Sequence, residues 1–404
     1  MSYCRICSGK LSLIIDFGKI SLVGNFLKKV KRIKKYNLSL NYCNDCKHVQ
    51  IKEIINRDLL FKNYLWETGI SKSNINLINE LINKLKKNRI NKTSKILEIA
   101  SNDGSFLKKI REKFKCFVLG VDPAKNLKKL KKNKDVLTLN NYFDKKLSQK
   151  IKKKFKFFDY IFARNVIAHV PNPNEIFSGA QNLLSEDGLF ILEVPHLFNI
   201  FKDNQYDNIF HEHIGFHSLK SIIDLCMLNN MKVLDIELIK SQGGSLRCYI
   251  GKKNNKRKSS RRINSILSME KKIGLYNPKK LENFKNKILN HIQELKNLMK
   301  DIKIKNKKIS IYGASGKGQA LMQFCNINEK LVESVYDKSK LKQGKYTPST
   351  NIKIRNPKEI NRKKIDYLLL LSWNIKEEIL KQEKKFIKHG GKFIVPFPKP
   401  RILN

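Results

Sequence analysis

The sequence predicts an α/β protein with a small N-terminal module, a central domain around a doubly wound, largely parallel sheet, and a second α/β unit at the C-terminal end. Three observations support this. Four cysteines form two close pairs near the N-terminus. From residue 96 onward, short apolar runs alternate with helical spacing, as in parallel sheets covered by helices. At residues 308–318 a strand and a glycine-rich turn begin the pattern again. We expect domains at residues 1–56, 57–252 and 253–404, and the 404-residue length suits two or three domains.

The composition describes a folded and strongly basic chain. Hydrophobic residues make up 41% of it, enough to bury substantial cores. Lys and Arg outnumber Asp and Glu by 83 to 35, a formal net charge of +48. Lysine is spread along nearly the whole chain together with Ile and Asn, the signature of an AT-rich coding bias, and no nucleic-acid-binding module accompanies it. We therefore expect an anionic small molecule as partner, and not nucleic acid.

The sequence also bears on location. No stretch approaches the roughly 20 consecutive apolar residues that span a bilayer. The N-terminus, Met1-Ser-Tyr-Cys4, lacks the basic and then apolar layout of a secretory signal. A cytoplasmic enzyme without a membrane partner is expected, while the oligomeric state does not follow from the sequence.

The cysteine pairs of the N-terminal module are Cys4-x-x-Cys7 and Cys43-x-x-Cys46, separated by 35 residues. Each pair can point two thiolates at one ion, and two pairs complete the tetrahedral set of four sulfurs that zinc favours. Disulfides are the alternative, but a reducing cytosol works against them. A redox motif needs one such pair and not two. We predict a structural zinc ion, because four protein ligands leave no open position for catalysis.

The elements of the central domain follow from apolar spacing. Residues 61–87 have helical spacing, residues 96–99 form a predicted strand, residues 105–114 a helix and residues 117–121 the next strand. Further strands are predicted at residues 136–139, 158–162, 189–194, 231–236 and 246–250. Helical spacing between most of them supports the doubly wound sheet.

The C-terminal part begins after a basic run at residues 252–262 that contains no apolar residue and is best interpreted as a solvated linker or loop. A long amphipathic helix is predicted at residues 278–299. The second α/β unit continues through apolar runs at residues 331–336, 367–371 and 392–395.

A cofactor loop is predicted between the first strand and helix of the central sheet, the edge where ligands bind in such folds. The segment Glu98-Ile-Ala-Ser-Asn-Asp-Gly104 has small residues at the turn, with Asp103 facing a polar ligand group and Gly104 relieving backbone crowding. It lacks the G-x-G-x-x-G pattern of dinucleotide binders. Asp122, which ends the next strand 19 residues after Asp103, can accept hydrogen bonds from a ribose diol. It can equally cap a helix that starts at Pro123.

Beyond this loop, the chain resembles the S-adenosylmethionine-dependent sugar C-methyltransferase family, which includes a C3-methyltransferase of deoxysugar biosynthesis. The resemblance extends over nearly the full length, in eight segments that occur in the right order. They are the paired cysteines, Tyr64-x-Trp66 with Ser71, Ala163-Arg-Asn-Val-Ile-Ala-His169, His211-Glu-His213, Gly243-Gly-Ser-Leu-Arg247, Tyr312-Gly-Ala-Ser-Gly-Lys317-Gly, Ser372-Trp-Asn374 and Val395-Pro-Phe-Pro398, in addition to Ser101-Asn-Asp-Gly104 of the cofactor loop. The resemblance implies Rossmann-like folds for the central and C-terminal domains.

The resemblance also implies a cofactor and catalytic residues. S-adenosylmethionine is the expected cofactor, held by Glu98, Ser101, Asn102, Asp103, Gly104, Asp122 and Asn165. His213 matches the general base, Glu212 its neighbour, His169 a residue near the sugar and Tyr64 a tyrosine that reaches the active site, with His211 as a further candidate.

The residues themselves leave these roles open. If the His-Glu-His segment is extended, His211 and His213 share one face. The pair can also merely cap a loop or pack against Phe210 and Phe216. A zinc protease is excluded by spacing, since it needs His-Glu-x-x-His. Phe210 stands where the family has a tyrosine, and Trp66 stands where a second aromatic residue, usually tyrosine, is expected.

In the C-terminal unit, the turn Gly313-Ala-Ser-Gly-Lys-Gly318 forms a candidate anion site. By resemblance this domain helps to hold the nucleotide diphosphate of a sugar. The candidate substrate ligands are Gly313, Ser315, Lys317, Asp337, Trp373 and, from the central domain, Arg247. A plain tight turn, a helix-capping Asp337 and a core Trp373 are the alternatives.

Together these features predict an S-adenosylmethionine-dependent C-methyltransferase that acts on a nucleotide-diphosphate keto sugar, by base-catalysed enolisation and then methyl transfer to carbon. One alternative keeps the methyltransferase and changes the acceptor to another carbon or an oxygen. A non-catalytic nucleotide-sugar-binding protein of the same fold is another, and a nucleic-acid methyltransferase comes last.

Overall fold

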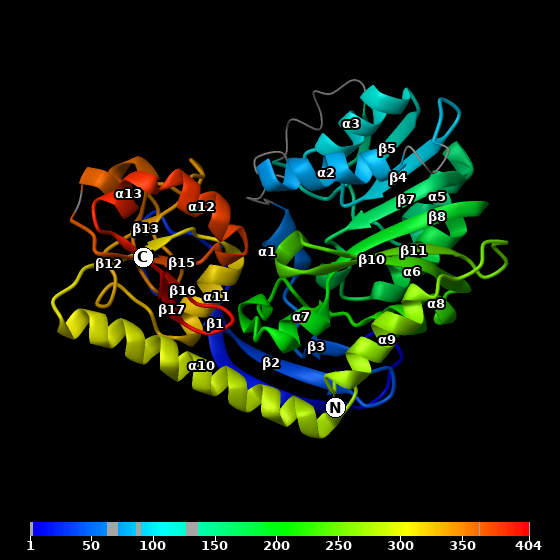
Figure 1. The fold of residues 1–404 in the computed structure, drawn as a ribbon. Coiled ribbons are helices and arrows are strands. Elements are labelled where there is room, and N and C mark those ends of the chain that lie inside the picture. Colours follow the sequence, from blue (N-terminus) through cyan, green and yellow to red (C-terminus); the bar gives the residue numbers. More distant parts are fainter. Residues whose placement is uncertain (1–2, 63–71, 86–89, 127–135, 363, 404) are drawn as a thin grey trace.

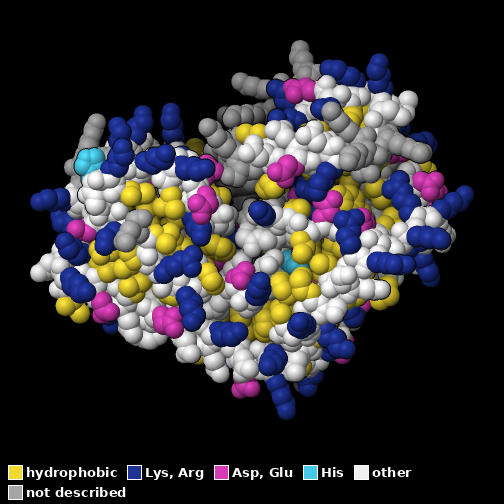
Figure 2. Space-filling model, viewed as in Figure 1, with side chains coloured by type: hydrophobic (Ala, Val, Ile, Leu, Met, Phe, Trp, Pro, Cys, Tyr) yellow, Lys and Arg dark blue, Asp and Glu magenta, His cyan; other side chains and the backbone are white. Residues whose placement is uncertain are grey.

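The computed structural model describes residues 3–62, 72–85, 90–126, 136–362 and 364–403. These residues form three sheets with helices packed against them (Figure 1). None of the helices in this part of the chain is long and apolar enough to cross a bilayer. On the face seen in Figure 2, Lys and Arg are scattered and do not gather in one patch, and a hollow lies between the lobe of the central sheet and the C-terminal lobe.

The N-terminal sheet is antiparallel and has the order β1-β2-β3-β9. The first three strands are β1 (Leu11–Ser21), β2 (Lys35–Cys43) and β3 (Val49–Ile51). The fourth, β9 (Gly215–Phe216), comes from the central part of the chain and begins two residues after His213. The cysteine-rich module therefore shares a sheet with the segment that follows the His-Glu-His motif.

The central sheet has seven strands in the order β10-β11-β8-β7-β4-β5-β6. They are β4 (Lys95–Ile99), β5 (Phe117–Val121), β6 (Leu137–Leu139), β7 (Phe158–Arg164), β8 (Leu184–Pro195), β10 (Met231–Ile239) and β11 (Ser245–Lys252). Strands β4 to β8 pair in parallel, and β11 runs antiparallel between β8 and β10. The strand order reverses between β4 and β7, and in open α/β sheets the ligand crevice lies at such a point. The predicted α/β class is confirmed.

Helices cover both faces of this sheet because its strands are apolar on both sides. Alternate residues of β4 enter different clusters: Ile96 packs with α2 (Lys72–Leu85) and α3 (Ser105–Phe114), and Leu97 packs with the opposite layer. That layer contains α5 (Lys145–Phe155), α6 (Pro173–Leu183), α8 (Leu219–Leu228) and α9 (Arg262–Lys272). Two short helices, α1 (Arg57–Phe61) and α7 (Leu197–Lys202), lie nearer the N-terminal sheet (Figure 1).

The C-terminal sheet has the order β14-β13-β12-β15-β16-β17 and is parallel except for β17. Its strands are β12 (Ile309–Tyr312), β13 (Val335–Tyr336), β14 (Ile354–Arg355), β15 (Tyr367–Leu370), β16 (Lys392–Val395) and β17 (Arg401–Leu403). Helices α10 (Pro278–Ile304) and α11 (Gly316–Phe324) pack on one face, and α12 (Lys376–Gln382) and α13 (Lys384–Lys388) on the other. Helix α10 begins at the predicted residue, where the Asn277 side chain caps it, and continues five residues past the predicted end.

One hydrophobic core joins the three parts of the chain. It contains Leu40 of β2, Phe210 and Phe216 of the central part, Leu281 of α10 and Leu321 of α11, all buried. Residues 209–216, which carry the His-Glu-His motif, therefore lie where the N-terminal sheet, the central domain and the C-terminal domain meet.

Candidate active site

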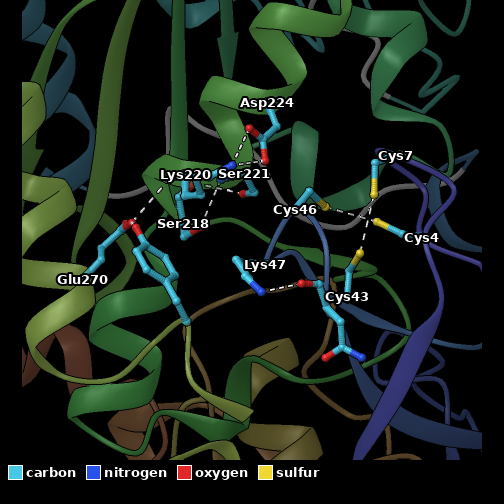
Figure 3. A network of polar contacts seen from close by, with 12 residues as sticks. Cys4, Cys7, Cys43, Cys46, Lys47, Ser218, Lys220, Ser221, Asp224 and Glu270 are labelled. Carbon is cyan, nitrogen blue, oxygen red and sulfur yellow. Dashed lines mark hydrogen bonds and ion pairs between the residues drawn. The ribbon is translucent and has the colours of Figure 1, made fainter.

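The four paired cysteines converge at one point of the N-terminal module (Figure 3). Their Sγ atoms all lie within 4.8 Å of one another, and the Cys4–Cys46 and Cys7–Cys43 pairs are each 3.5 Å apart. Four sulfurs at a zinc–sulfur distance of about 2.3 Å around one ion are separated by about 3.8 Å, so the arrangement fits zinc. The hydrogen bond with Cys46 lowers the pKa of Cys4, and the same bond raises that of Cys46. A divalent cation is what would stabilise all four thiolates together.

The zinc module is connected to the central domain through Arg5, which lies between the first two cysteines. Its guanidinium donates to the backbone oxygen of Ile214 at 2.9 Å, and the backbone N–H of Ile214 donates to the oxygen of Ala168 at 2.7 Å. Ala168 and Ile214 are neighbours in sequence of His169 and His213. The cysteine knuckle thus supports the two chain segments that carry these histidines.

The cofactor loop after β4 has an uncommon backbone. Ala100, Asn102 and Gly104 all have positive φ angles, of 56°, 52° and 72°. Such strain concentrates at functional sites. Gly120 in β5 allows the loop to pack closely on that strand, because a Cβ at this position would lie 2.5 Å from the Ser101 hydroxyl oxygen.

Asp122 anchors this loop from the end of β5. Its two carboxylate oxygens accept hydrogen bonds of 2.8 Å from the backbone N–H groups of Asn102 and Ala124. Burial raises the pKa of the Asp122 carboxyl, while those two bonds lower it. Because each carboxylate oxygen has a second lone pair, the geometry leaves capacity for a ribose hydroxyl as well.

Buried polar atoms without a partner lie on either side of this crevice. Glu98, 2% exposed, forms an ion pair with Arg164 through Oε1 at 2.6 Å, and burial raises the pKa of Glu98 to about 7. Its other oxygen, the Ser101 hydroxyl and the Asn165 amide oxygen are buried and accept no hydrogen bond from the described residues. Buried acceptors without a partner are costly, and an amino acid or nucleoside group in the crevice would satisfy them. The residues fit S-adenosylmethionine.

His169 and His213 face each other at the edge of the central sheet. Their ring centroids are 4.8 Å apart in an edge-to-face arrangement. Nδ1 of His169 lies 2.7 Å from the backbone oxygen of Glu212, and Nδ1 of His213 lies 2.8 Å from that of Asn208. A carbonyl oxygen only accepts, so Nδ1 of each ring carries the hydrogen, and Nε2 of His213 keeps a lone pair. His169 also interacts with the backbone of Asn165. The tautomer of His213 suits proton acceptance at Nε2.

The surroundings keep these imidazoles neutral. Burial lowers the pKa of His169 to about 4. Burial also lowers the pKa of His213 well below its ordinary value, and the neighbouring His169 and Lys317 lower it further. Glu212 has the opposite shift, because burial raises the pKa of its carboxyl to about 7. A Cβ on Gly24 would lie 3.5 Å from this carboxyl, so Glu212 extends toward the loop after β1.

The other candidate catalytic residues are placed differently. His211 and His213 would share a face only in an extended segment. Residues 211 and 212 form a turn and not a strand, so this argument does not apply. The His211 ring is 2% exposed and contacts the N-terminal sheet, with Nε2 2.9 Å from the backbone oxygen of Asn37. Tyr64, with Trp66 and Ser71, lies outside the described residues.

The glycine-rich turn of the C-terminal domain leads from β12 into α11. Gly313 has a φ of 92°, and a Cβ there would lie 2.4 Å from the Ser372 hydroxyl oxygen, so only glycine suits the position. Ser315 caps α11 by accepting from the Gly318 N–H. The Lys317 ammonium donates to the backbone oxygen of Gln242 in the central domain at 2.9 Å.

Three further predicted substrate ligands, like Ser315 and Lys317, already have protein partners. Trp373 donates its indole N–H to the Asp207 carboxylate at 2.7 Å. Asp337 accepts from the Ala314 N–H at 2.7 Å, and Lys342 lies 3.4 Å away. Arg247, 2% exposed, forms ion pairs with Glu193 at 2.6 Å and with Glu237 at 3.0 Å within the sheet. Their substrate contacts remain predictions.

Sequence reasoning missed two residues that shape this site, Asp207 and Asn208. Neither belongs to a recognisable motif; Asp207 binds Trp373, 166 residues further along the chain, and Asn208 acts through its backbone oxygen, which no sequence pattern reports. Arg164, by contrast, lies inside a motif that the sequence offered, and its pairing with Glu98 could have been expected from the two ends of neighbouring strands.

Known proteins match the whole chain. Three family models match in order: a zinc binding domain over residues 4–61, a methyltransferase domain over residues 72–236, and a C-methyltransferase C-terminal domain over residues 240–398. The C-methyltransferase NovU of Streptomyces niveus is 30% identical over 407 residues, which cover 99% of this chain and 96% of NovU.

Two solved methyltransferase structures each resemble less than half of the chain. The plantazolicin methyltransferase BpumL in complex with SAH has a TM-score of 0.35 at 11% identity, over 43% of this chain and 82% of that one. The cyclopropane synthase MmaA2 from Mycobacterium tuberculosis has a TM-score of 0.35 at 9% identity, over 49% and 92%. Because these TM-scores are low, the family assignment rests on the sequence matches. On those matches, the chain belongs to the S-adenosylmethionine-dependent C-methyltransferases that carry a zinc-binding domain before, and a C-methyltransferase domain after, the methyltransferase domain.

Proposed function

We propose that this C-methyltransferase acts on a nucleotide-diphosphate keto sugar and methylates the carbon beside the ketone through an enolate. The observation that carries the proposal is the His169–His213 pair. Both Nδ1–H groups bond to backbone oxygens, and burial keeps both rings neutral. The Nε2 acceptor of His213 suits removal of a weakly acidic proton from carbon.

In this mechanism, Nε2 of His213 removes the proton from the carbon next to the carbonyl group. The electron pair of that C–H bond delocalises onto the carbonyl oxygen, and His213 becomes an imidazolium whose Nδ1–H stays bonded to the Asn208 oxygen. S-adenosylmethionine bound at the loop after β4 would supply an electrophilic methyl group to the enolate carbon and would thereby become S-adenosylhomocysteine. Formation of the new carbon–carbon bond restores the carbonyl, and His213 passes its proton to solvent.

The other residues near His213 stabilise charge and position the sugar in our proposal. The Glu212 carboxyl, protonated up to about pH 7, can donate a hydrogen bond to the enolate oxygen and can stabilise an imidazolium once it ionises. His169 lies against the same ring and orients the sugar. The diphosphate would bind at the start of α11, where Gly313, Ser315 and Lys317 lie.

Replacement of the base tests the proposal. The probe is thymidine diphosphate-linked 4-keto-6-deoxyglucose, and the reaction is followed by S-adenosylhomocysteine formation and by deuterium exchange from solvent at the carbon beside the ketone. His213→Ala is expected to lose both signals, by about 100-fold or more, with unchanged affinity for S-adenosylmethionine. Full exchange in this variant would rule out His213 as the base.

A second candidate function is methylation of another carbon or an oxygen, and Phe210 favours it. The Phe210 ring packs on His213, with centroids 4.2 Å apart, and has no hydroxyl to hold an enolate. Its Cζ points at α11, 3.4 Å from where a Cβ on Gly316 would lie. With enolisation chemistry, Phe210→Tyr is expected to raise turnover of the probe, and Phe157→Tyr at an exposed position is the matched control. Methyl transfer without any deuterium exchange would favour the second candidate.

A further inference from the structure

Three consecutive residues, Tyr206 to Asn208, connect the catalytic base to the C-terminal part of the chain. They form one short helical turn and are all buried. The Tyr206 hydroxyl lies 3.0 Å from Nδ1 of His291 in α10. The Asp207 carboxylate accepts from the Trp373 indole, and the backbone oxygen of Asn208 is the partner of His213 Nδ1. Of these three residues, Asp207 carries the charge.

The Asp207 carboxylate is 0% exposed, and such a group needs compensation from polar partners. The C-terminal domain supplies it. The indole N–H of Trp373 donates at 2.7 Å. Burial raises the pKa of the Asp207 carboxyl, and the positive charge of Lys317 and the indole hydrogen bond oppose that shift. Asp207 in turn stabilises the charge of Lys317, which burial opposes. Lys317 lies in the first turn of α11, and Trp373 begins the short helical turn after β15, so the interaction forms only when the C-terminal domain is docked.

A second contact ties the same side chains to the central domain. Lys317 donates to the backbone oxygen of Gln242, in the turn between β10 and β11. The neighbouring Gly243 has a φ of 90°, and a Cβ there would lie 3.0 Å from the Trp373 ring. The indole is therefore enclosed between Asp207 and the turn at residues 241–243.

We propose that Asp207 is a positioning residue: by binding Trp373 of the docked C-terminal domain, it holds the Asn208 carbonyl in place and thereby keeps His213 in the Nδ1–H tautomer, with Nε2 toward the substrate. The proposal rests on the proposed function, in which His213 is the base. It assigns Trp373 to the domain interface, where the sequence had suggested a substrate contact.

The first test measures the base itself and needs no substrate. In protein labelled with ¹⁵N-histidine, the His213 signals are identified by their loss in His213→Ala. The wild type is expected to show a single Nδ1–H tautomer, and Asp207→Ala and Trp373→Phe to show a mixture of tautomers. Asp187→Asn, which changes an exposed carboxylate on β8, is the control and should match the wild type. A single unchanged tautomer in Asp207→Ala would overturn the proposal.

The second test separates positioning from substrate binding, with the thymidine diphosphate keto sugar as probe. Asp207→Ala and Trp373→Phe are expected to lower kcat by about 100-fold, as a small misplacement of a catalytic group does, with little change in KM or in S-adenosylmethionine affinity. Asp207→Asn keeps an oxygen acceptor for the indole and is expected to recover most of kcat. A rise in KM with unchanged kcat in Trp373→Phe would instead make Trp373 a substrate ligand.

Trp373→Phe keeps an aromatic ring at the position and removes the N–H donor, so it carries the test if Asp207→Ala folds poorly. The two proposals also fail differently. If the variants change the His213 tautomer as expected but the wild type does not turn over the probe, only the keto-sugar function is contradicted. If the wild type turns over the probe and every variant keeps the Nδ1–H tautomer, only the role of Asp207 is contradicted.

Discussion

His169 and His213 lie edge to face, 4.8 Å apart between ring centroids, although 43 residues separate them in sequence. Each ring donates its Nδ1–H to a backbone oxygen, and the oxygen that holds His169 belongs to Glu212, the residue before His213. The two histidines are therefore oriented by one short chain segment, and a displacement of that segment moves both.

The pH dependence of kcat/KM follows from the lowered pKa of His213. A histidine accepts a proton only when it is neutral, and a lowered pKa delays protonation to lower pH. Burial is the main cause, with His169 and Lys317 adding to it. Activity toward the probe is therefore expected to persist to a pH well below 6.5, the ordinary value for histidine. Lys317→Met removes a positive charge and should move the acid limb to higher pH, while Lys358→Met at an exposed position should leave it unchanged. An acid limb at or above pH 6.5 in the wild type would contradict this.

Zinc removal is expected to abolish turnover indirectly, through the contact of Arg5 with the segment next to His213. Without the ion, the knuckle that contains Arg5 loses its constraint, and with it the support at the Ile214 oxygen next to His213. Treatment with a chelator should lower the melting temperature and the rate together, and added zinc should restore both. Cys43→Ser should lose zinc as measured by metal analysis, and Cys226→Ala, a core cysteine outside the cluster, should keep it. Full activity in zinc-free protein would show that the knuckle does not support the base.

Gly120 is expected to be required for cofactor binding. An alanine there would press on Ser101 and push the cofactor loop out of position. Overpacking costs about 1–3 kcal/mol, so the Kd for S-adenosylmethionine measured by calorimetry should rise about tenfold or more. In Gly24→Ala the new Cβ meets only an ordinary contact with Glu212, and this control should bind the cofactor normally. Equal affinities in the two variants would mean that the loop adapts.

A buried carboxylate, Glu270 of α9, should contribute strongly to stability (Figure 3). It is 0% exposed and accepts hydrogen bonds from the Leu219 N–H at 2.6 Å, from the Tyr276 hydroxyl, and from the ring N–H of His196 at 2.6 Å. Glu270→Ala leaves these groups unpaired and is expected to lower the free energy of unfolding by about 3 kcal/mol in urea titrations. Glu282→Ala at an exposed position of α10 should change it by less than about 0.5 kcal/mol. Similar stability in both variants would show that the site relaxes.

Much of the local structure was predictable because its causes are local. Helix α3, strand β5 and strand β16 occupy the predicted residues, since apolar spacing and turn residues decide them. The cysteine cluster was also predictable, because a C-x-x-C pair brings two thiols together by itself. The cofactor loop followed from its position after the first strand of the sheet.

Other features were not predictable from local pattern. In an extended segment His211 and His213 would share a face. Residues 211 and 212 instead form a turn, and the His211 ring lies against the N-terminal sheet at the Asn37 oxygen. Strand β9 joins that sheet across more than 160 residues of sequence. No periodicity reports such a pairing, because it depends on how two domains pack.

The sequence by itself determined most strands of the central sheet, the cysteine cluster and the family, because each depends on neighbouring residues or on a motif. Only the tertiary structure decided which histidine nitrogen is free and which partners hold Lys317, Trp373 and Arg247. The physical reason is that a buried charged or hydrogen-bonding side chain needs a polar partner close to it in space. In this protein those partners come from distant segments that meet only when the three parts pack around one core.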